Sequence, residues 1–414
     1  MAYLITEIEI TEDLPSLEIP QDKTGFALRV KFQGKPIGFV MRENPGTSLL
    51  SPHELSEILG QSIGKKLLQE KIRSELIASV DVCQFPSLTV AICTKDRPEN
   101  VQRCLNSLLP LQQVNDSKQF EILVIDNAPS NEQTKTVIDS LPSIRYVREP
   151  KPGLDFARNR ALQEATGELL AFLDDDVVVD SGWLQGLKTA WAENPDAGGF
   201  TGLVWPYELE TEAQILFEKR GGFGRGFEKI RHGQTCEGNP LYPCGAGIFG
   251  AGCNMTFRRD LLLKLGGFDE ALDTGAPLPG GGDLDIFYRV VRSNYPLVYE
   301  PSYLVYHQHR LDLKGLQRQY WSWGLGFMAF IVKSYRQDPR QRSQFIKLVG
   351  WWFKDQLTQL VQSLTGDHVL PSTMILAELW GGIVGLLGEY SRSEKRSDQI
   401  RHQFPTETWS STQG

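Results

Sequence analysis

The chain has 414 residues, of which 41% are hydrophobic and 23% are charged, and its formal net charge at pH 7 is −8. This length and composition predict a globular protein with either one large domain and appendages or two domains. The acidic balance, without any lysine-rich run, argues against nucleic acid as a partner. The first residues lack the basic and apolar regions of a signal peptide, so we expect a cytoplasmic protein.

Residues 1–85 predict a small α+β unit. Alternating apolar residues at 25–32 indicate a half-buried strand, and Gln33-Gly34-Lys35-Pro36 indicates a turn before a returning strand at 37–40. The segment 51–54 combines a capping serine, a proline and an acidic residue, which predicts the start of a helix that runs towards Leu76. We find no catalytic constellation in this unit, so a structural appendage is favoured over a docking module.

From residue 88 onwards, strands and helices alternate. Apolar runs at 88–93, 120–125, 144–147 and 169–173 indicate buried strands with helices between them. Repeated strand–helix units predict a parallel sheet with right-handed crossovers. Polar residues that follow such strands are expected to converge on one rim of the sheet. These residues are Thr94, Asp96, Asp126 and Asp174 to Asp176.

The strand at 169–173 ends in three consecutive carboxylates, Asp174, Asp175 and Asp176. Three adjacent acidic side chains repel one another and stay ionised together only near a cation or hydrogen-bond donors. Mg²⁺ and Mn²⁺ prefer such oxygen ligands, and Mg²⁺ commonly joins carboxylates to a phosphate. The pattern therefore predicts a divalent-metal site, and a solvated acidic loop is the alternative.

Several short motifs, in the same order and at similar spacings, resemble family-2 glycosyltransferases. In the donor half they are VAICTKDRP, EILVIDNAPS, KPGLDFARNRAL and LLAFLDDDV, and in the acceptor half GAGCNMTFRRDLLLKLGGFDE and GGGDLDIFYRV. The resemblance covers roughly residues 87–310. It implies an α/β, Rossmann-like nucleotide-diphospho-sugar transferase (GT-A) fold over 86–312, with a donor half at about 86–205 and an acceptor half at about 206–312.

The resemblance implies a nucleobase pocket at the first two strand ends. Asp126 would accept a hydrogen bond from the base, since a buried carboxylate needs such a donor. Thr94, Asp96 and Arg97 would line the same pocket. For Thr94, capping of the strand end is an equal alternative.

For the diphosphate, the resemblance implies a contact with Arg158, because backbone N–H groups and an arginine at a helix start can meet phosphates. The alternative is a surface ion pair between Arg158 and Asp155. Asp174 and Asp175 are also assigned to the nucleotide sugar.

The implied metal ligands are Asp176, Asp174 and His307. Two alternate histidines, His307 and His309, would share one face of a strand, which suits a metal or phosphate contact. A surface histidine without a ligand is nearly as well supported.

Asp283 aligns with the catalytic aspartate of inverting members of the family and would deprotonate the acceptor hydroxyl. The family commonly has a glutamate before this aspartate, whereas this chain has Gly282. Capping of a helix is the alternative for Asp283. Trp205, Asn254 and Asp285 are assigned to the sugar and acceptor site, and helix capping or loop fixing is favoured for Asp285.

Residues 313–392 predict apolar helices interrupted by charge, each too marginal for a membrane span. Tryptophans beside lysines suit helices that lie in a membrane interface, and a helical bundle against the catalytic domain is the alternative. Residues 393–414 are expected to form a flexible tail.

The sequence thus predicts a metal-dependent (Mn or Mg) inverting glycosyltransferase. It would move a sugar from a nucleotide-diphosphate sugar, with a UDP-sugar favoured, to a saccharide or lipid-linked acceptor in polysaccharide or glycolipid biosynthesis. The expected location is the cytoplasm, at the inner face of the plasma membrane. One alternative is a haloacid-dehalogenase-type phosphohydrolase that uses Asp174 and Asp176. The other is a catalytically inactive sugar-binding protein, suggested by the missing glutamate before Asp283.

Overall fold

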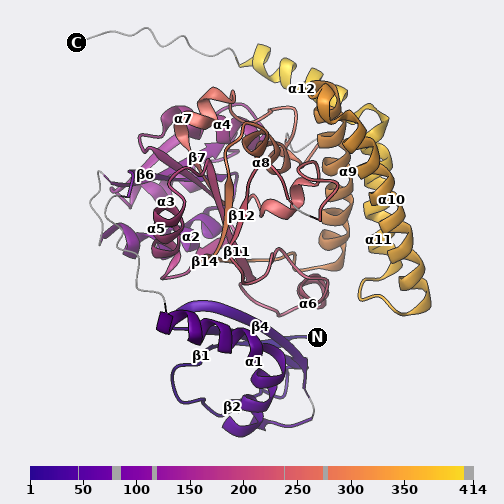
Figure 1. Cartoon of the computed structure of the whole chain (residues 1–414). Coiled ribbons are helices and arrows are strands. Elements are labelled where there is room, and N and C mark those ends of the chain that lie inside the picture. Colours follow the sequence, from indigo (N-terminus) through magenta and orange to yellow (C-terminus); the bar gives the residue numbers. More distant parts are fainter. Residues whose placement is uncertain (45, 77–84, 114–118, 237, 274–277, 405–414) are drawn as a thin grey trace.

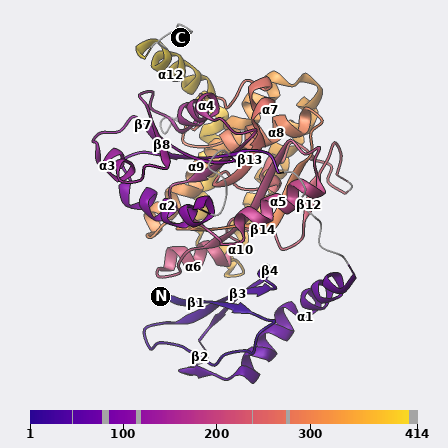
Figure 2. The same cartoon turned by 90° about the vertical axis from the view of Figure 1, so that its left-hand side faces the viewer.

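The computed structural model describes residues 1–44, 46–76, 85–113, 119–236, 238–273 and 278–404. Three parts are visible in Figure 1. A small N-terminal unit lies below a large sheet that is covered by helices, and a group of long C-terminal helices stands along one side. Figure 2 shows the same N-terminal unit from the side, with its helix running along its edge.

The N-terminal unit is a three-stranded sheet with one helix. The strand order is β1 (Tyr3–Glu9), β3 (Gly25–Phe32) and β4 (Lys35–Glu43), and α1 (Pro52–Leu76) packs its buried leucines on the sheet. The hairpin turn uses Gln33 and Gly34, which both have positive φ angles of 51° and 75°, as a tight two-residue turn requires. The strands, the turn and the helix predicted for this unit are confirmed. A further short pair consists of β2 (Leu17–Glu18) and β5 (Leu49–Leu50).

The N-terminal unit is attached to the large sheet through buried polar and aromatic contacts. The Nζ of Lys31 lies 2.6 Å from Oδ2 of Asp180, and both side chains are almost fully buried. The hydroxyl of Tyr306 donates to the same Asp180 oxygen at 2.6 Å. The rings of Phe39 and Trp205 have centroids 6.2 Å apart. The unit therefore covers the part of the sheet that contains Tyr306, directly before His307.

The large sheet has nine strands and mixed direction. Its order is β10-β14-β11-β13-β9-β6-β7-β8, with β12 paired to β14. The segment β9-β6-β7-β8 is parallel, as the strand–helix alternation predicts, whereas β13 is antiparallel to both β9 and β11. The strands are β6 (Leu88–Thr94), β7 (Phe120–Asn127), β8 (Ile144–Glu149), β9 (Leu169–Asp174), β10 (Val177–Val179), β11 (Gly199–Pro206), β12 (Ile230–His232), β13 (Asn254–Arg258) and β14 (Leu297–His307).

Both faces of this sheet are buried, which explains the continuous apolar runs of its strands. Alternate side chains of β6 go to opposite cores: Ala91 joins one core, and Val90 and Ile92 join the other. The first core includes residues of α4 (Leu154–Glu164), α7 (Arg259–Lys264) and α8 (Gly282–Arg292). The second includes residues of α2 (Pro98–Gln113), α3 (Gln133–Asp139) and α5 (Trp183–Glu193).

The C-terminal part is helical. It consists of α9 (Leu313–Gln337), α10 (Arg342–Thr365), α11 (Ser372–Val384) and α12 (Tyr390–Gln403). Among the described residues, no helix is both long enough and apolar enough to cross a membrane. Figure 1 shows α9 next to the sheet domain and α10 with α11 on the outer side.

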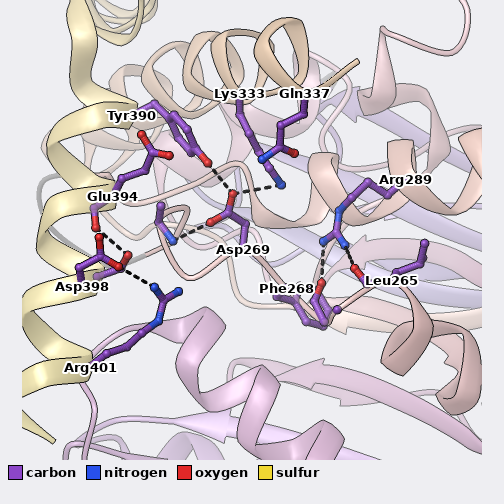
Figure 3. Close-up of a pocket in the computed structure, with 14 residues that line it drawn as sticks. Leu265, Phe268, Asp269, Arg289, Lys333, Gln337, Tyr390, Glu394, Asp398 and Arg401 are labelled. Carbon is purple, nitrogen blue, oxygen red and sulfur yellow. Dashed lines mark hydrogen bonds and ion pairs between the residues drawn. The ribbon is translucent and has the colours of Figure 1, made fainter. Parts of the chain in front are cut away.

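The prediction of a flexible tail from residue 393 is wrong up to residue 403, because α12 continues to Gln403. The composition of this polar helix could not predict the residues elsewhere in the chain that hold it in place. A cavity of about 360 Å³ lies beside α12, and Figure 3 shows the residues that line it. The Tyr390 hydroxyl donates a hydrogen bond to Asp269 Oδ2 at 2.8 Å, and Lys333 Nζ lies 3.1 Å from the same oxygen. Arg401 adds an ion pair with Glu270 at 2.7 Å. Residues 405–414 lie outside the described part of the chain.

Candidate active site

The parallel strands bring the predicted polar residues to one rim. In the pairing of β6 with β7, Thr94 is opposite Asp126, and in the pairing of β6 with β9, Cys93 is opposite Asp174. The antiparallel strand β10 returns beside β14 so that Val177 is opposite His307. The three carboxylates and the histidine therefore meet at the carboxyl ends of the central strands, where open α/β sheets bind ligands.

Asp126 has the geometry of a ligand-binding carboxylate. Its side chain is buried, and its Oδ2 accepts a hydrogen bond from the hydroxyl of Tyr146 at 2.9 Å. Its Oδ1 is also buried and has no hydrogen-bond partner among the described residues. Burial raises the pKa of this carboxyl, and the Tyr146 hydroxyl opposes the shift. A buried acceptor without a donor is costly, so Asp126 is well placed for an N–H group of a ligand.

Asp96 lies beside this pocket in a loop. It has a positive φ of 55°, and its Oδ1 accepts a hydrogen bond from the backbone N–H of Ser130 at 2.8 Å. The side chain thus ties the loop after β6 to the loop after β7, the two loops that border Asp126.

The middle acid, Asp175, is held by the other two residues assigned to the nucleobase pocket. Thr94 Oγ1 donates to its Oδ2 at 2.7 Å, and Arg97 Nη1 lies 3.0 Å from its Oδ1. Burial raises the pKa of Asp175, as does the adjacent Asp176, while Arg97 and Thr94 counteract this. These bonds fix the loop after β9. Direct contacts of Thr94, Arg97 and Asp175 with a nucleotide stay predictions.

Asp174, Asp176 and His307 form a set of three possible metal ligands. One ligand atom from each residue lies within 4.8 Å of the other two, and His307 Nε2 is 3.3 Å from Asp176 Oδ1. Burial and the Asp176 carboxylate raise the pKa of Asp174 to about 6. Burial, with His309 next to it, lowers the pKa of His307 to about 3, so its imidazole is neutral. Two carboxylate oxygens and a neutral imidazole nitrogen fit a divalent cation such as Mn²⁺.

Two further residues complete a buried hydrogen-bonded chain behind His307. Its Nδ1 lies 3.0 Å from Nδ1 of His309, and Nε2 of His309 lies 2.7 Å from Oε1 of Glu218. Burial lowers the pKa of His309 to about 3 and raises the pKa of Glu218 to about 8. The two histidines are therefore neutral, and the extra proton of the group is on Glu218. The donor–acceptor direction of the two hydrogen bonds decides whether Nε2 of His307 is free to bind a metal.

Arg158 forms an ion pair with Asp155, as the alternative to a diphosphate contact predicted, but the pair is buried rather than at the surface. Its Nη1 is 2.9 Å from Asp155 Oδ1 and 3.3 Å from Asp273 Oδ2, and its side chain is buried. The Oδ2 of Asp155 is buried and has no hydrogen-bond partner among the described residues. A β-carbon on Gly252 would lie 3.4 Å from Nη2 of Arg158 and 3.2 Å from Oδ2 of Asp283. Arg158 therefore lies next to Asp283, and its contact with a diphosphate stays a prediction.

Asp283 lies in the first turn of α8, and its side chain and Arg158 Nη2 both lie close to Gly252. Burial raises the pKa of the Cys253 thiol well above its usual value, and Asp174, Asp176 and Asp283 add to this rise. These carboxylates are therefore in the same region of the molecule as Cys253. Asp283 Oδ1 accepts from the backbone N–H of Leu284 at 2.8 Å, which fixes the orientation of its carboxylate.

Gly282 leaves room for two carboxylates. A β-carbon there would lie 2.2 Å from Asp155 Oδ2 and 2.5 Å from Asp273 Oδ2. The Gly282 N–H donates to Asp273 Oδ2 at 2.9 Å. The space in which a side chain at position 282 would begin is therefore filled by acidic groups from α4 and from the segment before α8. This arrangement explains why the chain has glycine before Asp283.

Gly282→Ala is expected to displace the start of α8 and to lower the free energy of unfolding by about 1–3 kcal/mol. The reason is that its β-carbon has no room beside the two carboxylates. Gly280→Ala is the matched control, since the atoms nearest to its β-carbon are 3.6 Å away or farther. Urea unfolding checks this. Equal behaviour of the two variants would contradict the steric account.

The three residues assigned to the sugar and acceptor are all enclosed. Trp205 is 2% exposed and packs against Phe39 of the N-terminal unit. Asn254 is fully buried, accepts a hydrogen bond from Trp183 Nε1 and donates one to the Tyr303 carbonyl. This placement leaves Trp205 and Asn254 without side-chain surface for a sugar and indicates structural roles.

Asp285 is also structural, in agreement with the loop-fixing role favoured for it. Its oxygens lie 2.5 Å from Lys333 Nζ and 2.7 Å from Arg289 Nε. Lys333 and Arg289 line the cavity drawn in Figure 3, on the side of α8 that faces α9 and α12. The acceptor assignment for Asp285 is therefore not supported.

The fold is that of a glycosyltransferase. Residues 89–266 match the family model described as glycosyl transferase family 2. This part of the chain therefore belongs to that enzyme family and has its α/β, Rossmann-like nucleotide-sugar transferase fold.

Several curated proteins are similar to the chain over the same region. It is 23% identical over 193 residues to the glucosyl-dolichyl phosphate glucuronosyltransferase of Haloferax volcanii, an alignment that covers 44% of this chain and 56% of that protein. It is 25% identical over 241 residues to the succinoglycan biosynthesis protein ExoM of Rhizobium meliloti, covering 56% and 71%. For the pre-mycofactocin glycosyltransferase of Mycobacterium tuberculosis the identity is 26% over 228 residues, covering 55% and 44%. The chain thus spans about half the length of several of these relatives.

Among solved structures, the mannosyltransferase PcManGT from Pyrobaculum calidifontis, in complex with GDP-Man and Mn²⁺, is similar with a TM-score of 0.46 and 16% identity. The comparison covers 83% of this chain and 96% of that chain.

Proposed function

We propose that the protein is a metal-dependent, inverting glycosyltransferase that uses a nucleotide-diphosphate sugar. The observation that carries the proposal is the meeting of two features on one rim of the sheet: a buried acceptor at Asp126 without a partner among the described residues, and the ligand set around His307. The carboxylate of Asp283 lies beside Arg158, in the first turn of α8. These groups are suited in turn to a nucleobase, to a metal and diphosphate, and to an acceptor hydroxyl.

The donor would lie across the ends of β7, β6 and β9. Asp126 Oδ1 would accept a ring N–H of the base, and a uracil has such a group, so a UDP-sugar is the donor that we favour. Asp174, Asp176 and His307 would hold Mn²⁺ or Mg²⁺, which neutralises charge on the diphosphate as it leaves. Arg158, close to Asp283, would contribute positive charge near the same space.

In the transfer step, the acceptor hydroxyl oxygen forms a bond to the anomeric carbon while the bond from that carbon to the diphosphate oxygen breaks. The nucleoside diphosphate leaves with the bonding electron pair, and the hydroxyl proton passes to a carboxylate oxygen of Asp283. A single displacement inverts the configuration at the anomeric carbon. The acceptor is a saccharide or lipid-linked hydroxyl in polysaccharide or glycolipid biosynthesis, and a lipid-linked acceptor would place the enzyme at the cytoplasmic face of a membrane.

The two alternatives explain fewer features. A phosphohydrolase that used Asp174 as nucleophile would have no use for the acceptor on Asp126, and its motif belongs on the first strand of the sheet, whereas β6, β7 and β8 precede β9 here. An inactive sugar-binding protein was suggested by the missing glutamate before Asp283. Asp155 and Asp273 place carboxylate oxygens 2.2 and 2.5 Å from where a β-carbon at position 282 would lie, so acidic groups are present next to Asp283 without that glutamate, which favours an active enzyme.

The expected result of a thermal-shift screen with UDP, GDP, TDP and CMP is that UDP stabilises the protein only when Mn²⁺ is present. At one hundred times its dissociation constant, a ligand raises the free energy of unfolding by about 2.7 kcal/mol, enough for a clear shift in Tm. Asp176→Ala should lose this shift. Glu212→Ala, which removes an exposed acid in the first turn of α6 (Glu212–Lys219), is the control. If no nucleotide stabilises the protein with or without metal, the donor site is wrongly assigned.

A further inference from the structure

The outer face of α10 and α11 is apolar. On α10 the exposed fraction is 61% for Ile346, 51% for Trp351, 60% for Val361 and 71% for Leu364, and on α11 it is 58% for Trp380. The two helices contact each other, and in Figure 1 they form the outer side of the helical region. A group of large exposed apolar side chains on neighbouring helices normally marks a contact with another molecule or with a membrane.

The exposed charges within these two helices all have one sign. The exposed charged side chains of α10 are Arg342, Lys347 and Lys354, and in both helices, which are described over their full length, no acidic residue is exposed. The two acids that they contain, Asp355 and Glu378, are half-buried. The whole chain has a net charge of −8, so this face departs from the rest of the protein in both polarity and charge.

We propose that the face formed by α10 and α11 docks on the surface of an anionic lipid bilayer. Tryptophan and leucine side chains beside lysine and arginine are suited to the boundary between lipid headgroups and acyl chains, and anionic headgroups attract the basic residues. A second copy of the chain fits less well. In a two-fold dimer the same patch meets itself, which would place Arg342, Lys347 and Lys354 against one another without an exposed acid in either helix.

Helix α9 joins the docked face to residues 279–282, the segment directly before Asp283. On one side, α9 is in close contact with α11, since a β-carbon on Gly324 would lie 2.0 Å from the Glu378 carbonyl oxygen. On the other side, Ser322 Oγ donates to the Pro279 carbonyl at 3.1 Å, and a β-carbon on Gly281 would lie 2.8 Å from the Gly326 carbonyl. The bilayer would therefore hold the segment before Asp283 at a fixed distance. In the proposed function, a lipid-linked acceptor would then reach Asp283 from the bilayer side. This consequence rests on the proposed function, but the docking itself does not depend on it.

The test uses the full chain and co-sedimentation with vesicles of phosphatidylcholine alone or mixed with phosphatidylglycerol. We expect binding to the anionic vesicles and at least tenfold weaker binding to neutral ones. Lys347→Gln with Lys354→Gln should weaken binding to anionic vesicles about 25-fold, roughly fivefold for each charge. Trp351→Ala with Trp380→Ala should weaken binding to both kinds of vesicle. Leu68→Ala, which removes an exposed apolar side chain (60% exposed) on α1, should bind like the wild type.

Three outcomes would overturn the proposal. The first is no binding of the wild type to anionic vesicles, and the second is binding that the Leu68 control loses as much as the double variants do. The third is a dimer in light scattering that both double variants dissociate, because a second copy would then cover the face. Metal-dependent nucleotide binding, measured without vesicles, tests the proposed function separately: either property can fail while the other holds.

Discussion

Asp283→Asn is expected to lower kcat for sugar transfer by about 10²- to 10⁴-fold, the usual contribution of a general base. The amide keeps the size of the side chain and can still accept the hydrogen bond from Leu284 N–H, but it cannot take the proton of the acceptor hydroxyl. The affinities for Mn²⁺ and for the nucleoside diphosphate should stay within about twofold, because the metal ligands and Asp126 are unchanged. Steady-state kinetics, with nucleotide binding measured by calorimetry, check both parts.

The control is Asp260→Asn, which neutralises a carboxylate in the first turn of α7 that forms a surface ion pair with Lys264 at 2.8 Å. This variant should transfer sugar like the wild type, since surface pairs contribute little. Asp283→Asn with full kcat would exclude this residue as the base. A large loss of nucleotide affinity in the same variant would instead assign it to donor binding.

The second large effect concerns the chain from His307 through His309 to Glu218. His309→Ala is expected to weaken Mn²⁺ binding by about 10- to 100-fold, the usual effect of losing the partner of a metal-binding histidine. Without Nδ1 of His309, the His307 ring loses the hydrogen-bond partner that sets the position of its proton. Electron paramagnetic resonance of free Mn²⁺ measures the affinity without any substrate. His232→Ala is the control, because His232 is another buried histidine, with a pKa lowered to about 4 by burial, that packs on Phe249.

The same chain predicts a pH dependence of metal binding. Below its raised pKa of about 8, Glu218 is protonated and donates a hydrogen bond to Nε2 of His309. The proton of His309 is then on Nδ1 and is donated to Nδ1 of His307. The proton of His307 is therefore on Nε2, the atom that must bind the metal. When a metal binds Nε2 of His307, each hydrogen bond of the chain reverses its donor and acceptor, and Glu218 becomes ionised, so that one proton is released. The Mn²⁺ affinity should therefore rise about tenfold per pH unit from pH 6.5 to 7.5 and level off above pH 8.

Glu218→Gln tests the origin of this slope. A glutamine side chain can donate or accept at His309 but does not titrate, so the affinity should become nearly independent of pH between 6.5 and 7.5. A wild-type affinity that is flat across this range, or an unchanged slope in Glu218→Gln, would contradict the proton chain.

The residues on the rim of the site could be predicted from the sequence, because each of them directly follows a buried strand. Each buried apolar run ends in its polar residue, as β9 ends at Asp174, and parallel pairing then brings the ends together. The partners of these residues could not be predicted, because they come from distant parts of the chain. Glu218 is 91 residues from His309, and Asp273 is 115 residues from Arg158. Asp273 carries no motif of its own in the sequence.

Two predictions that were made from residue type alone differ from the structure: the sugar contact of Trp205 and the flexible tail from residue 393. Trp205 has the side chain of a sugar-binding residue, but β4 of the N-terminal unit covers it, and no pattern near Trp205 predicts that contact. α12 was expected to be flexible because its residues are polar. Its stability comes from Asp269 and Glu270, which lie more than 100 residues earlier in the chain.

The attachment of the N-terminal unit to β14 has a consequence for synthesis on the ribosome. Domains that emerge first generally fold first, and the fully buried core residues of this unit, including Phe26 and Leu55, all come before residue 60. Its outer surface is not complete, because Tyr3, Ile5 and Met41 pack with Leu209 and Ile215. The partner of Phe39, Trp205, also comes later, and Lys31 meets Tyr306 at 3.3 Å only after some 300 residues have been made. The nascent chain therefore carries an exposed apolar surface through most of its translation, and the N-terminal unit reaches its final packing only after β14 has been made.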